Sequence, residues 1–170
     1  TTQSPHAIQS SRESERSGLQ RSANGVEFVG ASRIDVGGIG KGLIADLAAE
    51  YLSARGVDRA RIACSGDLRF VGQGPWQVAI EDPRADVPLR KIAVSGACGV
   101  STSGDYRNFW IVNGKRYHHL IDPTTGRPGE CNRQVTVVAP IAAQADALAS
   151  GMFFIPAPEG IKVLRAIEGV

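Results

Sequence analysis

The chain has 170 residues, of which 42% are hydrophobic and 21% charged, and its formal net charge is +2. This length and balance are typical of one globular domain with a sizeable core. The weak net charge gives no broad electrostatic case for nucleic acid or for an anionic membrane surface. The apolar runs are too short to span a bilayer, no signal-peptide pattern is found, and three widely spaced cysteines indicate neither a zinc site nor a disulfide framework.

The first expected elements are a lead-in, a strand and a helix. Residues 1–25 are polar and have no hydrophobic period, which predicts a mobile or partner-dependent lead-in. A single domain is therefore expected over residues 26–170, and it begins with a short strand, VEFVG. Residues 41–55 form the clearest helix, because apolar side chains recur at helical spacing and Gly56 follows as a stop.

Strand-like runs rich in β-branched and aromatic residues follow this helix. They are RARIAC, PWQVAI, KIAVSG, NFWIVNG, KRYHHLI and QVTVVA. An Asn-Gly pair predicts a hairpin between residues 109–112 and 115–121. Two more helices are expected, one over residues 142–154 and one through IKVLRAIE. This order predicts an α+β fold with a largely antiparallel sheet and packed helices.

A glycine-rich stretch, DVGGIGKGLIAD, precedes the first helix. Backbone N–H groups and the positive end of the helix dipole can face an anion in such a loop, and Lys41 adds a positive charge. The spacing matches neither the Walker A nor the Rossmann pattern. A phosphate site and a purely structural turn are both open interpretations.

Three further groups of polar residues are candidate sites. Asp146 and Ser150 lie roughly 40° apart on one helix face and suit Mg²⁺, although a simple Asp–Ser hydrogen bond is the alternative. The run STSGDY is interpreted as a hydroxyl-rich turn, which binds a polar ring edge or caps itself. His118 and His119 share a strand and face opposite sides, so only one can address a site. Histidine suits general acid–base work, but a lone strand histidine is more often structural.

The ordered motifs IDVGGIGKG, CSGDLRFVG, PWQVAIEDP, STSGDYRNF, KRYHHLIDPTTGRP and QADALASG together resemble the ApbE family, the bacterial FAD:protein FMN transferases. The match begins near Ile34 and runs to the C-terminus. The resemblance implies an ApbE-like, T-fold-like domain that uses Mg²⁺ and transfers FMN from FAD to a threonine hydroxyl of a target flavoprotein, with release of AMP. Targets in the family include flavin-carrying subunits of redox-driven ion pumps.

The resemblance also implies a role for individual residues. His119 matches the family's histidine and would act as the catalytic base or position the acceptor hydroxyl, while Asp122 would shape the turn behind it. The implied metal ligands are Gly38 (through its carbonyl), Asp146, Ala149 (through its backbone) and Ser150. The implied flavin contacts are Asp35, Lys41, Leu120, Asp105 and Tyr106.

This chain departs from the family pattern in three ways. Ser150 replaces the usual threonine, CSGDL replaces an Asn-x-Gly-Gly-Asp motif, and full members are about twice as long. A domain without its N-terminal half is therefore expected: a fragment, a short natural form, or a half completed by another chain. The alternative functions are an FAD pyrophosphatase and a non-catalytic flavin-binding module. The resemblance leaves open a homodimer, a membrane-anchored or periplasmic setting, and a cytoplasmic one.

Overall fold

The computed structural model of the chain describes residues 18–30 and 34–170. It divides into two compact units, residues 1–35 and residues 36–170. Each unit has its own secondary structure. Among the described residues, no helix is both long enough and apolar enough to cross a membrane.

The first unit contains an antiparallel hairpin of β1 (Gly18–Ser22) and β2 (Gly25–Val29). β2 is the strand that VEFVG predicts. β1 lies within residues 1–25, which the composition assigns to a lead-in, so strand pairing reaches further toward the N-terminus than the apolar pattern indicates. Residues 1–17 of the predicted lead-in lie outside the described residues.

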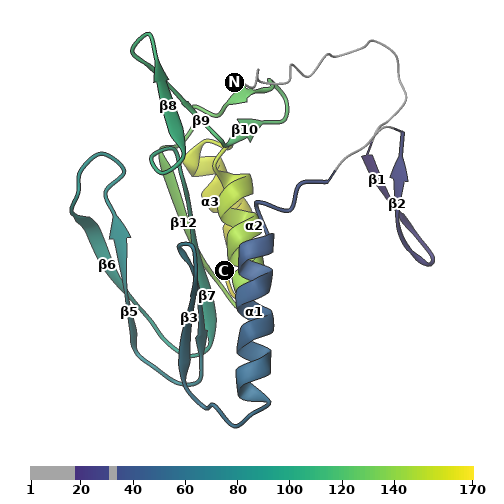
Figure 1. Cartoon of the computed structure of the whole chain (residues 1–170), viewed down its shortest axis with the longest axis vertical. Helices are drawn as coiled ribbons and strands as arrows, with labels where there is room; N and C mark the ends of the chain where they lie inside the picture. Colours follow the sequence, from purple (N-terminus) through teal and green to yellow (C-terminus); the bar gives the residue numbers. More distant parts are fainter. Residues whose placement is uncertain (1–17, 31–33) are drawn as a thin grey trace, which may run out of the picture. The chain divides into compact units, whose positions relative to one another are not determined.

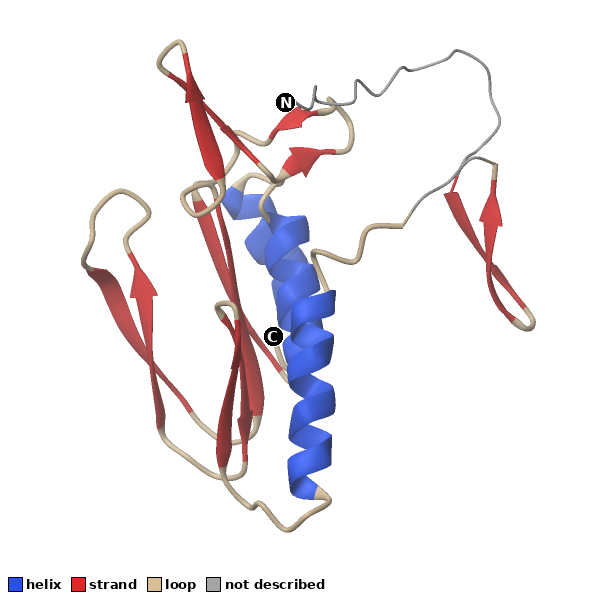
Figure 2. Ribbon diagram, viewed as in Figure 1, coloured by secondary structure: helices blue, strands red, loops and turns tan. Residues whose placement is uncertain are grey.

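The second unit is α+β, with helices along one face of an antiparallel sheet, as predicted (Figures 1 and 2). Its helices are α1 (Gly40–Ser53), α2 (Ala142–Met152) and α3 (Ala157–Arg165). Its strands are β3 (Ala60–Cys64), β4 (Asp67–Val71), β5 (Trp76–Glu81), β6 (Pro88–Val94), β7 (Cys98–Gly104), β8 (Phe109–Val112), β9 (Lys115–His118), β10 (Ile121–Asp122), β11 (Arg127–Pro128) and β12 (Gln134–Ala139).

The central sheet has the strand order β12-β7-β4-β3, with every neighbouring pair antiparallel. Two excursions interrupt it. The β5–β6 hairpin lies in sequence between β4 and β7, and the β8–β9 and β10–β11 hairpins lie between β7 and β12. The predicted Asn-Gly turn is present between β8 and β9, where Asn113 and Gly114 both have positive φ, of 50° and 74°.

Alternating side chains give the central sheet two different faces. One face carries a hydrophobic cluster of Leu68, Phe70, Cys98 and Val100, which packs with Val78 of β5. The other face meets the helices. There the cluster of β12 and α2 consists of Val137, Ala139, Ala145 and Ala149. Small side chains on this second face let α2 lie close to the sheet.

The interpretation of STSGDY as a turn is wrong for its first four residues, because residues 101–104 belong to β7, between β12 and β4. Small residues in β7 also let helix α2 approach the strand closely. A Cβ atom on Gly99 would lie 2.4 Å from the backbone N and Cα of Ala142, so α2 begins in direct contact with β7. Asp105 and Tyr106 follow the strand, although the backbone N–H of Asp105 still donates to the carbonyl oxygen of Arg133 at 3.1 Å.

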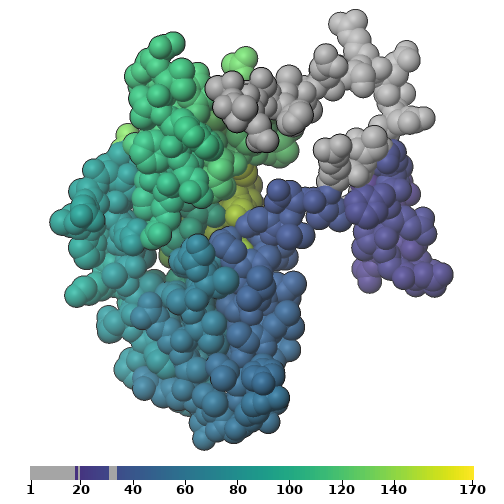
Figure 3. Space-filling view, viewed as in Figure 1, coloured from purple at the N-terminus to yellow at the C-terminus, as the bar shows by residue number. Residues whose placement is uncertain are grey.

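Helix α1 buries one side against the sheet and α2 and leaves the other side open. Its buried residues are Gly42, Ala45, Asp46 and Ala49. Large apolar side chains recur on the open side, and the space-filling view shows α1 (blue) at the surface (Figure 3). The exposed apolar residues of this side are Leu43, Ile44, Leu47 and Tyr51.

Replacing Gly99 with alanine is expected to lower the free energy of unfolding by about 3 kcal/mol, because the new methyl group overlaps backbone atoms of α2. The matched control is Gly151→Ala. A Cβ on Gly151, also in α2, meets nothing within 4 Å, so the better helix former should stabilise by up to about 1 kcal/mol. Urea unfolding of both variants measures the difference, and a loss below about 1 kcal/mol for Gly99→Ala would contradict the predicted overlap.

Candidate active site

The helix-facing side of β4 and β7 is polar, which is unusual for a sheet face that helices cover. Asp67 and Arg69 extend from β4 on this side, and Ser101 and Ser103 extend from β7. Asp67 is only 2% exposed and Ser101 only 1%. Buried polar groups need partners, and α1 and α2 supply them here.

Lys41, in the first turn of α1, lies at the centre of this polar region. Its Nζ donates to the carbonyl oxygen of Gly37 at 3.0 Å and lies 3.2 and 3.3 Å from the two carboxylate oxygens of Asp146. It also lies 3.2 Å from Oδ2 of Asp67. Burial alone would lower the pKa of Lys41, but the two carboxylates, Asp67 first, outweigh burial and raise it.

Asp146 joins α2 to the glycine-rich turn before α1. The backbone N–H of Gly42 donates to Oδ2 of Asp146 at 3.1 Å. A Cβ on Gly42 would lie 2.3 Å from the carbonyl oxygen of Ala142, so only glycine allows this approach of the two helices. The N-terminus of α1 therefore does receive an anion, and in this structure that anion is the carboxylate of Asp146.

Ser150, one turn after Asp146, lies against the glycine-rich loop. Its Oγ is 3.1 Å from Oγ of Ser103, and a Cβ on Gly38 would lie 3.2 Å from it. Among the hydrogen bonds of the described residues, none joins Asp146 directly to Ser150, the simpler alternative that the sequence left open. Ala149 packs its side chain in the core, so only its backbone could contribute to a site.

These groups fit a hard divalent cation. Within the described ranges no group of three or more His, Cys, Asp or Glu side chains has metal-binding geometry. The candidate donors are instead the buried carboxylate of Asp146, the hydroxyl of Ser150 one helical turn later, and the backbone of Gly38, which lies against that hydroxyl. Mg²⁺ typically takes one or two carboxylates and fills its other positions with water and phosphate oxygens.

Asp46 fixes the two helices at the other end of this contact. Its carboxylate accepts hydrogen bonds from the backbone N–H groups of Ala142 and Ala143, at 2.9 and 2.8 Å, and so caps the N-terminus of α2. Nε of Arg69 lies 3.0 Å from the same carboxylate. The position of Asp146 on α2 is thereby tied to α1 and to β4.

The two adjacent histidines differ in burial, but they do not share a strand as predicted: β9 ends at His118, and His119 lies in the bend that follows. His118 is buried, with Nε2 2.9 Å from the carbonyl oxygen of Gly129 and its ring edge-on to Phe153. His119 is exposed, and its Nδ1 lies 3.2 Å from the carbonyl oxygen of Asn108. His118 is thus a packed structural residue, and His119 is the one open to a substrate.

The Asp-Pro-Thr-Thr-Gly segment forms a tight, self-bonded turn behind His119. Oδ1 of Asp122 accepts from the backbone N–H of Thr124 at 2.8 Å and from its hydroxyl at 2.7 Å. The hydrogen bonds from Thr124 lower the pKa of Asp122. The carbonyl oxygen of Leu120 accepts from the backbone N–H of Gly129, so Leu120 is fixed next to the histidine.

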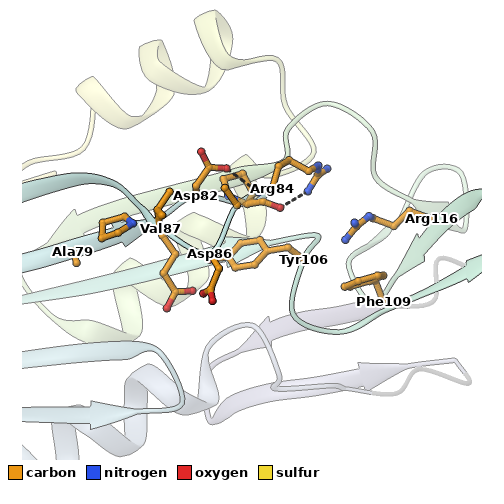
Figure 4. A pocket seen from close by; sticks show the side chains of 12 residues that line it. Ala79, Asp82, Arg84, Asp86, Val87, Tyr106, Phe109 and Arg116 are labelled. Atoms are coloured by element: carbon orange, nitrogen blue, oxygen red, sulfur yellow. Dashed lines mark hydrogen bonds between the residues drawn. The ribbon is translucent and has the colours of Figure 1, made fainter.

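Asp105 and Tyr106 lie beside an open cleft of about 570 Å³ that the sequence did not predict (Figure 4). Tyr106, Arg84, Phe109 and Arg116 are among the lining residues. Asp105 itself is buried and accepts two hydrogen bonds from Arg84, at 2.7 and 2.6 Å. Tyr106 is therefore available to a ligand in this cleft, whereas the carboxylate of Asp105 is engaged by Arg84.

The Arg84–Asp105 pair should make stability depend on pH. Burial by itself would raise the pKa of Asp105, but the Arg84 hydrogen bonds outweigh burial and lower it. A depressed folded-state pKa means that the pair stabilises fully above the unfolded value of about 3.9 and loses this effect as pH falls through the folded value.

Arg84→Met is accordingly expected to cost about 2 kcal/mol at pH 7, less than for a fully buried pair because the arginine side chain is 35% exposed. The difference from the unmodified chain should shrink as pH falls below about 3.9 and on through the lower folded pKa of Asp105. Arg107→Met is the matched control, since its pair with Glu81 is exposed and should contribute within about 0.5 kcal/mol. Urea unfolding across pH tests both; a cost for Arg84→Met that stays constant with pH would exclude the ion pair as its cause.

The remaining predicted contact, Asp35, belongs to the first unit, and its role as a flavin contact stays a prediction. Ser101 and Ser103 belong to the candidate run STSGDY, although they lie on a strand and not in a turn, whereas Asp67 was not predicted as a candidate site residue. Asp67 begins an alternating run, DLRF, in which the apolar residues are buried on the opposite face. That alternation is the signal that could have identified Asp67 as a helix-facing, buried carboxylate.

Comparison with known proteins gives a consistent family. The model of the ApbE family matches residues 2–170. The chain is 38% identical over 140 residues to a FAD:protein FMN transferase of Vibrio cholerae, covering 78% of this chain and 42% of that protein. It is 37% identical over 143 residues to the FAD:protein FMN transferase of Escherichia coli K12, covering 81% of this chain and 40% of that one.

Solved structures agree with these relatives. The ApbE protein of Thermotoga maritima superposes with a TM-score of 0.77 at 32% identity, covering 86% of this chain and 50% of its own. The flavin transferase ApbE of Vibrio cholerae gives a TM-score of 0.71 at 33% identity, covering 87% and 49%. The chain thus spans about half the length of these two solved proteins. It spans 42% and 40% of the length of the two curated relatives. With its α+β fold, its glycine-rich loop and these matches, the chain belongs to the ApbE family.

Proposed function

We propose that this chain carries the metal and phosphate-binding part of a Mg²⁺-dependent FAD:protein FMN transferase. The observation that carries the proposal is the gathering of three groups at the glycine-rich loop: the buried carboxylate of Asp146 contacts the Lys41 ammonium, and the hydroxyl of Ser150 lies against Gly38. The names of the relatives support the reaction, since they are FAD:protein FMN transferases.

The proposed cation ligands are Asp146, Ser150 and the backbone of Gly38, with the backbone of Ala149 as a further candidate. A bound Mg²⁺ would supply neutralisation of pyrophosphate charge. Lys41 would place its ammonium against a phosphate oxygen. Positioning and electrostatic stabilisation supply most of the catalysis in phosphoryl transfer.

His119 is the proposed base. The threonine hydroxyl of the target would lose its proton to His119, and its oxygen would form a bond to the phosphorus of the FMN half of FAD. The P–O bond to the AMP half would break, and AMP would leave with the bridging oxygen. Leu120, Tyr106 and Asp105 would form the flavin side of the pocket, and a flavin contact by Asp35 of the first unit stays a separate prediction. Targets would be flavoproteins with an acceptor threonine.

The test is incubation with FAD and Mg²⁺, with and without a threonine-containing acceptor peptide, followed by chromatography for AMP and mass spectrometry for flavin on the peptide. AMP together with an FMN-modified peptide is the expected result. AMP without modified peptide would replace transfer by hydrolysis of FAD to FMN and AMP. Absence of both products, with no binding of FAD, would contradict the proposal for this chain.

A further inference from the structure

Lys41 places one ammonium between two buried carboxylates, and only one of these, Asp146, has a role in the proposed function. Oδ2 of Asp67 lies 3.2 Å from Nζ of Lys41, as close as the nearer oxygen of Asp146. The Asp67 side chain is 3% exposed and that of Asp146 is 2% exposed. With all three groups ionised, this buried cluster carries a formal charge of −1.

The sheet fixes the orientation of Asp67 independently of Lys41. Asp67 is the first residue of β4 and follows a turn in which Ser65 and Gly66 have positive φ. Its Oδ1 accepts a short hydrogen bond from the hydroxyl of Ser101 on β7. Among the described residues, Oδ2 of Asp67 accepts no hydrogen bond, but it forms an ion pair with Nζ of Lys41. Asp67 is therefore a fixed carboxylate with one oxygen directed at the lysine.

A cation bound to Asp146 changes the balance at Lys41. Two unit charges of like sign about 4 Å apart repel by about 4 kcal/mol at an effective dielectric of 20, and a divalent ion repels more. The ammonium must then leave Asp146. Two of its present partners, Asp67 and the carbonyl oxygen of Gly37, are unaffected by this exchange. A lysine ammonium has three N–H donors, so the third is released for another acceptor.

We propose that Asp67 is a positioning residue that holds the Lys41 ammonium beside the glycine-rich loop when a divalent cation takes the carboxylate of Asp146. The N–H that Lys41 withdraws from Asp146 is then directed to a phosphate oxygen. The part of this inference that concerns the cation rests on the proposed function.

The environment of Asp67 supports a role other than stability. Burial, with the nearby charge of Asp146, raises the pKa of Asp67, and the hydrogen bond from Ser101 and the charge of Lys41 offset this only in part. A buried carboxylate whose ionised form is disfavoured costs folding free energy. Such groups are found more often at functional sites than elsewhere.

A metal-free experiment tests the hold of Asp67 on Lys41. Asp146→Asn imitates a carboxylate neutralised by a cation. In this variant, Lys41 should react with an amine-acetylating reagent about tenfold more slowly than in the Asp146→Asn/Asp67→Asn variant, because an ion pair that raises a lysine pKa by one unit lowers its free amine tenfold. The exposed Lys91 and Lys162 serve as internal standards for the reagent in both variants. Equal Lys41 labelling with and without Asp67 would overturn the proposal.

Mn²⁺ binding, followed by electron paramagnetic resonance, gives a second readout through a double-mutant cycle of Asp67→Asn and Lys41→Met. If Asp67 keeps the Lys41 ammonium away from the cation-bound carboxylate of Asp146, the lysine should oppose the cation only when Asp67 is absent. Lys41→Met should then improve Mn²⁺ affinity about tenfold in the Asp67→Asn background and far less in the unmodified chain. If Asp67 acts only through its own charge, Lys41→Met should have the same effect in both backgrounds, and the proposal fails.

Circular dichroism and thermal melting establish the folding of each variant. Should Asp67→Asn not fold, Ser101→Ala replaces it in both experiments, because it releases Asp67 from the sheet without changing any charge. The expected effects then keep their direction, and unchanged Lys41 labelling in Asp146→Asn/Ser101→Ala would count against the proposal. Failure of the unmodified chain to bind Mn²⁺ would remove the cation site of the proposed function, whereas the labelling result would still decide whether Asp67 positions Lys41.

Discussion

Asp146→Asn is expected to lower the rate of FAD cleavage by at least ~100-fold at saturating Mg²⁺, the loss typical of removing one principal electrostatic contact to a transition state. Asp146 is the one carboxylate in the proposed ligand set, so its loss leaves only neutral oxygen donors for a divalent cation. The amide is isosteric, and its oxygen can still accept the hydrogen bond from the backbone of Gly42. The fold should therefore survive a change that removes the site's charge.

Two measurements separate a cation-binding role from a structural one. Mn²⁺ affinity should fall about tenfold or more, an effect equal to a loss of about 1.4 kcal/mol in binding free energy. The matched control, Glu50→Gln, removes the same charge from the exposed side of α1 and should change neither the affinity nor the rate by more than about twofold, a surface effect. Unchanged Mn²⁺ binding in Asp146→Asn would show that the cation is held elsewhere.

Ser150 gives a graded version of the same test. Ser150→Ala removes a neutral donor and should cost less than the loss of the carboxylate, about tenfold in rate. Ser150→Thr keeps the hydroxyl and restricts its rotamers, so it should keep the activity. A set of cation ligands therefore predicts the largest loss of rate for Asp146→Asn, a smaller loss for Ser150→Ala and little loss for Ser150→Thr.

The regular elements of this fold could be predicted because their signals are local. The helical spacing of apolar residues identified α1, and the alternating β-branched run QVTVVA coincides with β12. Prediction failed at β7, whose sequence CGVSTSG is made of small and polar residues with little strand preference. Its strand state is imposed by pairing with β12 and β4 on either side, and a single local sequence does not contain that information.

The residues of the candidate site also differ in whether local sequence signals could predict their contacts. Asp146 and Ser150 could be paired from the sequence because four residues on a helix bring two side chains to one face. Ser103 reaches Ser150, and Asp67 reaches Lys41, only because the sheet register sets β7 and β4 beneath the helices. Contacts that depend on register across distant segments were missed, and they are the ones that extend the site.

His119→Ala is expected to lower the rate of flavin transfer by at least ~100-fold while leaving the free energy of unfolding within about 0.5 kcal/mol. The exposed side chain of His119 makes one contact to a backbone carbonyl, so little packing is lost when it is shortened. Its neighbour provides the matched control. His118 is 6% exposed and contacts Phe153 and the carbonyl of Gly129, so His118→Ala should cost about 2 to 3 kcal/mol of stability.

Exposure also gives the His119 prediction a test that a structural role would not pass. A base at an open position leaves room for a small molecule when its side chain is removed, so imidazole added to His119→Ala should restore part of the transfer rate in proportion to its concentration. Added imidazole should restore nothing to His118→Ala, because that ring is enclosed between Phe153 and the backbone of Gly129. Transfer that persists undiminished in His119→Ala would require another proton acceptor and would remove His119 from the mechanism, whereas rescue confined to His119→Ala identifies its imidazole as the base.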